Sequence, residues 1–180
     1  MASETSASPP AGSAFSSTKS AKQHLLRMYE VEHAKTLNVL KAFPAAKSEF
    51  RPHERSSTAL QLAWTFVLEE RMLLKTINGE QVLGSGFPPP PESWDAVLDA
   101  FNKGYDDIIA ALKDPKNADL TTTVHFFVAP KQTADIPALD FAEFMLHDQI
   151  HHRGQLSVYV RMAGGKVPAI YGPSADEPWF

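Results

Sequence analysis

Apolar side chains recur every three or four residues in four separate stretches of the chain, which is the spacing of one face of an α-helix. The first stretch runs from about residue 18 to 42, and Pro44 follows its end. The second ends near residue 77 and the third covers about 94 to 113. The fourth begins near Ile136 and ends at Gly164-Gly165. The pattern therefore predicts four amphipathic helices.

Residues that commonly begin or end helices mark the predicted boundaries. Ser56 and Ser57 are the expected N-caps of the second helix, and Asn78-Gly79 is its expected end. The run "GFPPPPESW" predicts a stiff polyproline connector that leads to Ser93, the expected N-cap of the third helix.

One segment departs from the helical pattern. Residues 120–128, "LTTTVHFFV", are β-branched and aromatic, which favours extended backbone. The sequence offers no second strand to pair with this segment, so we expect a crossover lying across the helices rather than a sheet. His53 and His125 fall in expected loops and receive no role. The prediction is an all-α protein, an up-down four-helix bundle with a long crossover before the last helix.

Composition limits the number of domains and the classes of partner. With 180 residues and 43% hydrophobic content, the chain has enough material for one substantial core. The 17 basic and 21 acidic residues are spread along the chain, so no basic block is present to neutralise a phosphate backbone, and nucleic acid is not expected as a partner. The chain has no cysteine, so any metal must be held by nitrogen and oxygen.

The first residues differ in composition from the rest. Residues 1–18 are rich in Ser, Ala and Pro and lack the apolar run of a signal peptide, and no later segment approaches a membrane span. We expect a disordered leader over residues 1–18, a single domain over residues 19–180, a cytoplasmic location and no membrane partner.

The last helix carries three histidines and an aspartate within six positions: His147, Asp148, His151 and His152. An apolar stripe steps along this helix by three or four residues, and its continuation passes through Asp148 and His152. The stripe is formed by Phe141, Met145, Leu156 and Tyr159. Asp148 and His152 are therefore the predicted inward pair. His147 and His151 form a neighbouring pair at the same spacing, about a hundred degrees round the helix, and are the alternative.

Polar residues also fall on the apolar stripes of two other helices. Glu69 and Thr65 lie on the inward face of the second helix, and His33 lies on that of the first, one turn after Glu30. Burying such groups without partners costs several kcal/mol, so either a metal ion or a closed hydrogen-bond network must satisfy them.

The metal and non-metal interpretations remain open for each residue. Asp148 and His152 form either a metal-binding pair or a buried hydrogen-bond network. Glu69 is either a ligand or the partner of an arginine such as Arg153, and His33 is either a ligand or a satisfied core histidine. Arg153 and Gln155 either orient the ligands or lie at a surface or interface.

The segment "IHHRGQLSVYVRMAGGKVPAIYGPSADEPW" resembles the DinB-like superfamily, whose signature is a histidine directly before Arg-Gly-Gln on the last helix, here His152. A weaker similarity covers "EHAKTLNVLKAFP" and "LAWTFVLEE" in the first two helices. The resemblance implies a four-helix bundle, commonly dimeric, that holds a divalent ion such as nickel or zinc. It also implies relatives that are thiol-dependent transferases or isomerases.

The family pattern of three histidine ligands is altered in this chain. Its last ligand corresponds to His152, but the residue four positions earlier is Asp148 and the ligand of the second helix falls at Thr65. The departure indicates either a lost metal or a rebuilt site in which Glu69 replaces the missing histidine and His33 or water completes the set. The predicted metal residues are thus Asp148, His152, Glu69 and His33, with nickel, zinc, manganese or iron as the ion.

Two functions follow as expectations. The first is a metal-dependent transferase or hydrolase that acts on a small molecule, such as a low-molecular-weight thiol, and forms a homodimer. The alternative is a non-catalytic dimeric scaffold or stress-related binding protein whose interior polar residues form a hydrogen-bond network.

Overall fold

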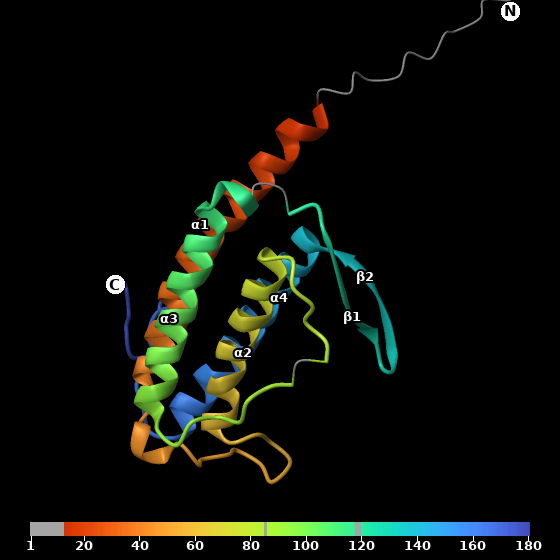
Figure 1. Cartoon of the computed structure of the whole chain (residues 1–180). Coiled ribbons are helices and arrows are strands. Elements are labelled where there is room, and N and C mark those ends of the chain that lie inside the picture. Colours follow the sequence, from red (N-terminus) through yellow and green to blue (C-terminus); the bar gives the residue numbers. More distant parts are fainter. Residues whose placement is uncertain (1–12, 85, 118–119) are drawn as a thin grey trace, which may run out of the picture.

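The computed structural model describes residues 13–84, 86–117 and 120–180, which form four α-helices and a two-stranded sheet (Figure 1). The helices are α1 Ser13–Ala42, α2 Ala59–Ile77, α3 Trp94–Lys113 and α4 Ala138–Met162. The strands are β1 Thr123–Ala129 and β2 Gln132–Pro137, and two short 3-10 helices cover Ala45–Lys47 and Pro115–Asn117. α1 begins before the predicted start at residue 18, and most of the expected leader, residues 1–12, lies outside the described residues.

The helix ends follow from local sequence, with one change of cap. Thr58, rather than Ser56 or Ser57, caps α2, because its hydroxyl accepts a hydrogen bond from the Gln61 backbone while the Gln61 side chain accepts one from the Thr58 backbone. The Ser93 side chain accepts from the Ala96 backbone and caps α3 as predicted.

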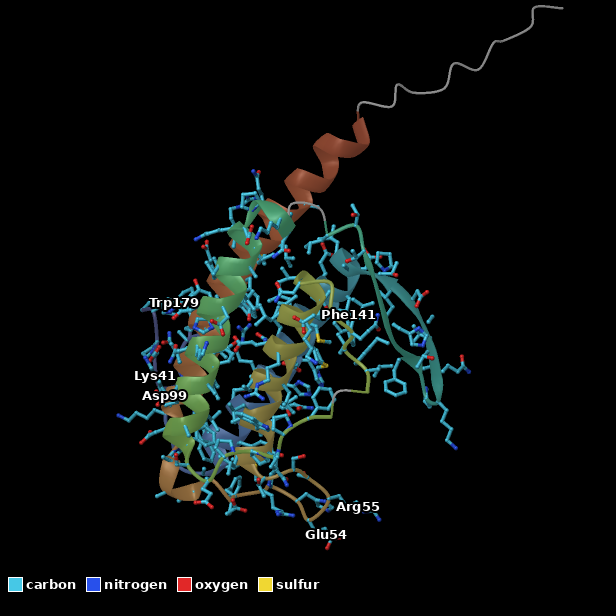
Figure 2. All side chains as sticks on the ribbon, viewed as in Figure 1. Lys41, Glu54, Arg55, Asp99, Phe141 and Trp179 are labelled. Carbon is cyan, nitrogen blue, oxygen red and sulfur yellow. The ribbon has the colours of Figure 1, made fainter. Side chains whose placement is uncertain are left out.

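The prediction that residues 120–128 form an unpaired crossover is wrong. β1 pairs antiparallel with β2, from Thr123 opposite Pro137 to Ala129 opposite Gln132. The signal for the partner strand in the sequence is weak because its six residues are largely exposed and only half of them are apolar, and because its turn uses Lys131, a non-glycine residue at φ 61°. Phe126 of β1 packs edge-on against Phe141 of α4, at 4.9 Å between ring centres, and so attaches the hairpin to the helices. Figure 2 labels Phe141 on the side of the helices that faces the hairpin.

The directions of the helices differ from a strictly alternating order. α1 and α4 run one way along the molecule, whereas α2 and α3 both run the other way (Figure 1). The long connector of residues 78–93 carries the chain from the end of α2 back to the start of α3. α2 packs against α3 and α4, and α1 also packs against α3 and α4, so each helix contributes to a shared interior. None of the helices in the described residues combines the length and apolar character that a membrane crossing needs.

The interior consists of two apolar clusters with a polar layer between them. One cluster includes Leu40, Phe66, Phe101 and Leu156, and the other includes Leu25, Leu73, Ile108 and Met145. Between these levels, along α1, α2 and α4, lie most of the buried polar side chains: Glu32, His33, Thr36, Glu69, Glu70, Gln149 and Arg153. Polar groups at this depth need partners, so this layer is where a functional site is expected.

Candidate metal centre

Glu69 of α2 and Asp148 and His152 of α4 bring one potential donor atom each to a single point, with all three atoms within 4.8 Å of one another. The His152 Nδ1 atom lies 2.7 Å from Glu69 Oε1 and 3.9 Å from Asp148 Oδ1. Asp148 and His152 share a helix face because they are four residues apart, and α2 packs against that face. Three of the four predicted metal residues thus meet.

The three side chains differ in their exposure to water. The Glu69 side chain is 1% exposed, whereas those of His152 and Asp148 are 19% and 34% exposed. The Phe66 ring stands edge-on to the His152 ring and covers it on one side. The group therefore has a dry side at Glu69 and a side open to solvent at Asp148.

Burial and mutual attraction shift the protonation of Glu69 and His152. Burial raises the pKa of Glu69 to about 7, although the hydrogen bond with His152 acts in the opposite direction. The hydrogen bond with Glu69 raises the pKa of His152 against the effect of burial. One proton shared between the two groups is consistent with both shifts, and a metal ion would have to displace it.

The donor set fits a divalent transition-metal ion. The second carboxylate oxygen of Glu69, Oε2, is buried and has no hydrogen-bond partner within the described part of the chain. One imidazole nitrogen and two carboxylate oxygens are ligands that zinc, manganese, iron and nickel accept. The unsatisfied Oε2 atom also counts against a closed hydrogen-bond network as a full account of this group.

The structure does not bring His33, the fourth predicted metal residue, into the group. Its ring stacks on Tyr105 and Phe101 of α3, at 3.9 and 4.6 Å between ring centres, and its Nδ1 atom lies 3.8 Å from Glu70 Oε1. Burial lowers the pKa of His33 to about 4, so the ring is neutral at physiological pH. His33 is a core histidine in this arrangement, but not a fully satisfied one, because its buried Nδ1 atom has no hydrogen-bond partner among the described residues.

Glu70 is the buried carboxyl group beside His33, and sequence reasoning missed it. The Tyr29 hydroxyl donates a hydrogen bond to Glu70 Oε1 at 2.9 Å, while Glu70 Oε2 has no partner among the described residues. Burial raises the pKa of Glu70 well above its usual range. The side chain fits only because Gly104 of α3 lies opposite: a Cβ atom at Gly104 would stand 2.2 Å from Glu70 Oε2.

We expect Gly104→Ala to reduce the free energy of unfolding by about 1–3 kcal/mol, because the added methyl group overpacks the space held by Glu70. Gly154→Ala is the matched control, since Gly154 is also in a helix and a Cβ atom there meets nothing within 4 Å. The control should be neutral or more stable by up to about 1 kcal/mol, through helix propensity. Urea denaturation of both variants is the measurement, and equal stability would contradict the close packing at Gly104.

His147 and His151, the alternative pair, lie in two different environments. The His151 Nε2 atom shares a hydrogen bond with the Gln155 amide, 3.0 Å away, on the exposed face of α4. His147 lines a pocket between α1 and α4. Neither belongs to the group formed by Glu69, Asp148 and His152.

Arg153, the residue after His152, does not pair with Glu69. Its guanidinium lies 2.7 Å from Glu32 Oε2 of α1, and both residues are buried. The Tyr171 hydroxyl, from the segment after α4, donates to the same Glu32 oxygen at 2.6 Å and contacts Arg153. Arg153 therefore joins α4 to α1 and to the C-terminal segment directly beside a donor of the candidate centre.

The fold and the site define a helical protein with a three-residue group suited to a metal ion. Comparison with known proteins shows the family to which the fold belongs. The DinB superfamily profile matches residues 28–156, more than half of the chain. The chain therefore belongs to the DinB superfamily.

Three relatives illustrate the extent of the similarity. The chain is 24% identical over 155 residues to the uncharacterized protein YrdA of Bacillus subtilis strain 168, covering 86% of this chain and 90% of that protein. The crystal structure of a DinB-like protein from Bacillus cereus ATCC 10987 matches with a TM-score of 0.69 and 25% identity, covering 83% of this chain and 97% of the other. The DinB-like protein YjoA of B. subtilis matches with a TM-score of 0.63 and 14% identity, covering 87% and 99% of the two chains, and shows the fold alone.

Proposed function

We propose that this protein is a metal-dependent enzyme in which Glu69, Asp148 and His152 hold one divalent ion and a small molecule is the substrate. The observation that carries the proposal is the convergence of these three donors within 4.8 Å, together with the unpartnered Oε2 atom of buried Glu69. Membership of the DinB superfamily supports it, since that superfamily is associated with metal binding.

The proposed reaction is transfer or hydrolysis, with a low-molecular-weight thiol as substrate or co-substrate. When bound, the ion lowers the pKa of a coordinated water or thiol and supplies a nucleophile near neutral pH. The chain's own residues provide the surroundings: Glu69 fixes one donor in the dry interior, Phe66 shields one side of His152, and Asp148 leaves an approach from solvent.

The 2.7 Å hydrogen bond between His152 and Glu69 favours a second candidate, a non-catalytic scaffold whose polar interior is a structural network. Titration of chelator-treated protein with Mn²⁺, Ni²⁺ and Zn²⁺ separates the two candidates. The enzyme proposal expects saturable uptake and a higher unfolding temperature, because ion at about 100 times its Kd adds about 2.7 kcal/mol of stability. A protein that takes up no ion and unfolds at an unchanged temperature would be the scaffold.

Metal affinity should fall as the pH is lowered from about 8 to 5. Protons compete with the ion for His152 and Glu69, whose pKa values are both raised, so the competition begins at a higher pH than for exposed side chains. Isothermal titration calorimetry at a series of pH values measures this. An affinity that stays constant over this range would exclude both groups as ligands.

We propose a cytoplasmic homodimer as the working form of the protein. Support comes from α4, where Phe144, Val158 and Met162 are 46%, 54% and 54% exposed on one face. A C2 dimer would bury this face against its own copy. Light scattering at micromolar concentration should give twice the chain mass of 19.8 kDa, and Val158→Glu should shift the protein toward the monomer. A monomeric wild type would refute the dimer.

A further inference from the structure

A pocket beside α2 and α4 lies beyond the candidate metal centre along the same two helices. Its volume is about 410 Å³, which is enough for a small organic molecule. The residues that line it are Ser56, Ser57, Leu62, Gln155, Val158 and Tyr159. The Tyr159 hydroxyl donates a hydrogen bond to the Ser57 carbonyl at 3.1 Å, and this bond holds the segment before α2 against α4 as one wall of the pocket.

Each donor of the metal centre has a pocket residue seven positions away on its own helix. The three pairs are Asp148 with Gln155 and His152 with Tyr159 on α4, and Glu69 with Leu62 on α2. Seven residues make about two turns, so the members of each pair lie one above the other on one helix face. The offset runs forwards on α4 and backwards on α2, and these helices run in opposite directions, so all three displacements point the same way (Figure 1). The pocket therefore continues the face that carries the donors, about 10 Å further along the helices at about 1.5 Å per residue.

The pocket and the metal centre also open to solvent on the same side of α4. The Asp148 side chain is 34% exposed at the centre, and Gln155, which lies two turns above it, is exposed in the pocket wall. The Gln155 amide reaches back one turn to the His151 Nε2 atom, 3.0 Å away, and His151 directly precedes His152. One end of the pocket is thus close to the level of the donors, and a molecule lying in it can extend to an ion held there.

The lining of the pocket is polar in part and uncharged. Its hydrogen-bonding groups include the hydroxyls of Ser56 and Ser57 and the amide of Gln155, while Leu62 and Val158 supply apolar surface. Of the six described residues that line it, none carries a charge at neutral pH. A carboxylate or phosphate placed there would lose part of its hydration without gaining a cationic partner. The lining therefore favours an uncharged molecule with an apolar part.

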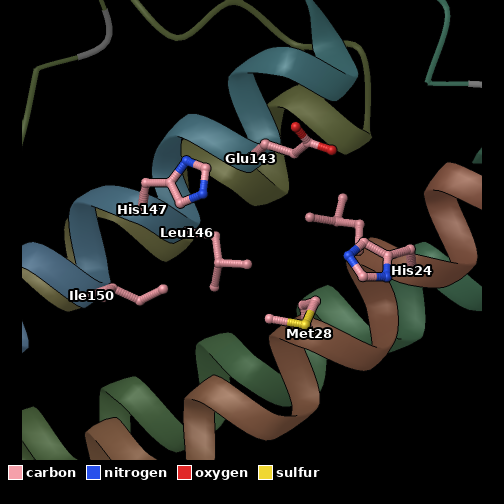
Figure 3. A pocket seen from close by; sticks show the side chains of 7 residues that line it. His24, Met28, Glu143, Leu146, His147 and Ile150 are labelled. Atoms are coloured by element: carbon pink, nitrogen blue, oxygen red, sulfur yellow. The ribbon is translucent and has the colours of Figure 1, made fainter. Parts of the chain in front are cut away.

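The pocket between α1 and α4 does not offer the same route. In Figure 3, His24 of α1 and His147 of α4 lie on opposite sides of this pocket, with Leu146 between them. The α4 residues that line it face α1, whereas Asp148 and His152 meet Glu69 of α2. A molecule in that pocket would lie on the other side of α4 from the metal centre.

We infer that the pocket lined by Leu62, Gln155 and Tyr159 receives the substrate of the metal centre, and that this substrate is an uncharged, partly apolar molecule. The inference rests on the proposed function, because it assigns the pocket to an ion held by the three donors. The reacting group lies at the ion, and the rest of the molecule extends along α4 to the apolar surface of Leu62 and Val158. Val158 also belongs to the α4 face proposed for the dimer, so a partner copy would lie along the rim of the pocket.

Three hydroxamic acids test the inference on the full chain loaded with zinc. Acetohydroxamic acid carries the metal-binding head alone, octanohydroxamic acid adds an uncharged apolar chain, and suberic acid monohydroxamate carries a similar chain that ends in a carboxylate. The Kd of octanohydroxamic acid should be at least about tenfold lower than that of acetohydroxamic acid, because its chain buries apolar surface in the pocket. The carboxylate should cancel most of this gain. Isothermal titration calorimetry measures the three affinities, and chelator-treated protein should bind octanohydroxamic acid at least about tenfold more weakly.

Two pairs of variants place the chain in the pocket. Leu62→Ala should raise the Kd of octanohydroxamic acid about fivefold and leave that of acetohydroxamic acid unchanged. Leu60→Ala is the matched control, since Leu60 is on the same helix and is 7% exposed against 6% for Leu62, but does not line the pocket. Gln155→Lys should lower the Kd of suberic acid monohydroxamate about threefold by adding a cation to the pocket wall, and His147→Lys, which adds the same charge elsewhere on α4, should not. Circular dichroism checks that each variant is folded.

The results distinguish this inference from the proposed function. Zinc-loaded protein for which the octanoyl chain adds no affinity would overturn the pocket assignment and leave the metal centre in place. Equal effects of Leu62→Ala and Leu60→Ala on octanohydroxamic acid would do the same. Tighter binding of suberic acid monohydroxamate than of octanohydroxamic acid by the wild type would overturn the uncharged substrate class. A protein that takes up no zinc would overturn both the inference and the proposed function.

Discussion

Replacing Arg153 with methionine should lower the free energy of unfolding by about 3 kcal/mol or more, because it leaves Glu32 as a buried charge without its arginine partner. Arg153 is 1% exposed and Glu32 is 2% exposed. Arg153 also donates to the Glu32 backbone carbonyl and to the Thr36 hydroxyl, so its loss removes several contacts between α4 and α1. Lys35 and Tyr171 still contact Glu32, which keeps the expected cost near the lower end for broken buried ion pairs.

Arg161→Met is the matched control for this effect. Arg161 lies on the same helix and also pairs with a carboxylate, Asp176, at 2.6 Å, but its side chain is 48% exposed. An exposed pair of this kind contributes little to stability, because water and salt screen it. Urea denaturation of both variants gives the comparison, and Arg153→Met combined with Glu32→Gln should recover part of the loss. Equal losses for Arg153→Met and Arg161→Met would contradict the importance of burial.

The penalty for losing Arg153 should shrink in acid. Burial raises the pKa of Glu32, but hydrogen bonds from Tyr171, Lys35 and Arg153 outweigh it, and the net pKa lies below the usual value of 4.5. A carboxyl group with a lowered pKa stabilises the folded state fully above 4.5, and this stability is lost as the pH falls through the lower, folded-state pKa. The difference between wild type and Arg153→Met should therefore be larger at pH 7 than at pH 3.

Local patterns predicted the helices well and the contacts between distant segments poorly. Helical spacing, Ser93 and the Asn78-Gly79 stop all act within a few residues, and the structure confirms these boundaries. The hairpin was missed because β2 is short and largely exposed, and the alternation of Thr133 and Asp135 with Ala134 and Ile136 covers only four residues. The directions of α2 and α3 depend on the path of the connector, which no local pattern encodes.

The same division applies to the candidate site. Asp148, His152 and Glu69 could be identified because each continues an apolar stripe, and a stripe shows which face is buried. His33 also continues a stripe and is buried, but burial does not specify a neighbour, and α1 turns this residue toward α3. The contact between Arg153 and Glu32 joins residues more than a hundred positions apart, with Tyr171 added from a segment that has no periodicity, so sequence alone gave no signal for it.

Removing one donor of the metal group should abolish high-affinity binding at this centre. We expect Glu69→Ala and Asp148→Ala each to weaken it by about a hundredfold or more, because a site with two remaining donors loses both charge and chelation. His33→Ala and His151→Ala are the controls, since neither side chain reaches the group. The measurement is calorimetric titration of each chelator-treated variant with metal ion. If His151→Ala abolished binding and Asp148→Ala preserved it, the inward pair assigned to α4 would be the wrong one.

Asp148→His tests the same geometry through a gain of affinity. It places an imidazole at the position where the sequence resemblance implies one, and imidazole is a better ligand for nickel than carboxylate. Because the residue at position 148 already lies within reach of Glu69 and His152, nickel affinity should rise by about tenfold without movement of the helices. Asp148→Asn, which removes the charge and adds no imidazole, should instead lose affinity. If Asp148→His and Asp148→Asn changed the nickel affinity in the same way, the side chain at position 148 would not touch the ion. The group would then be held together by its hydrogen bonds.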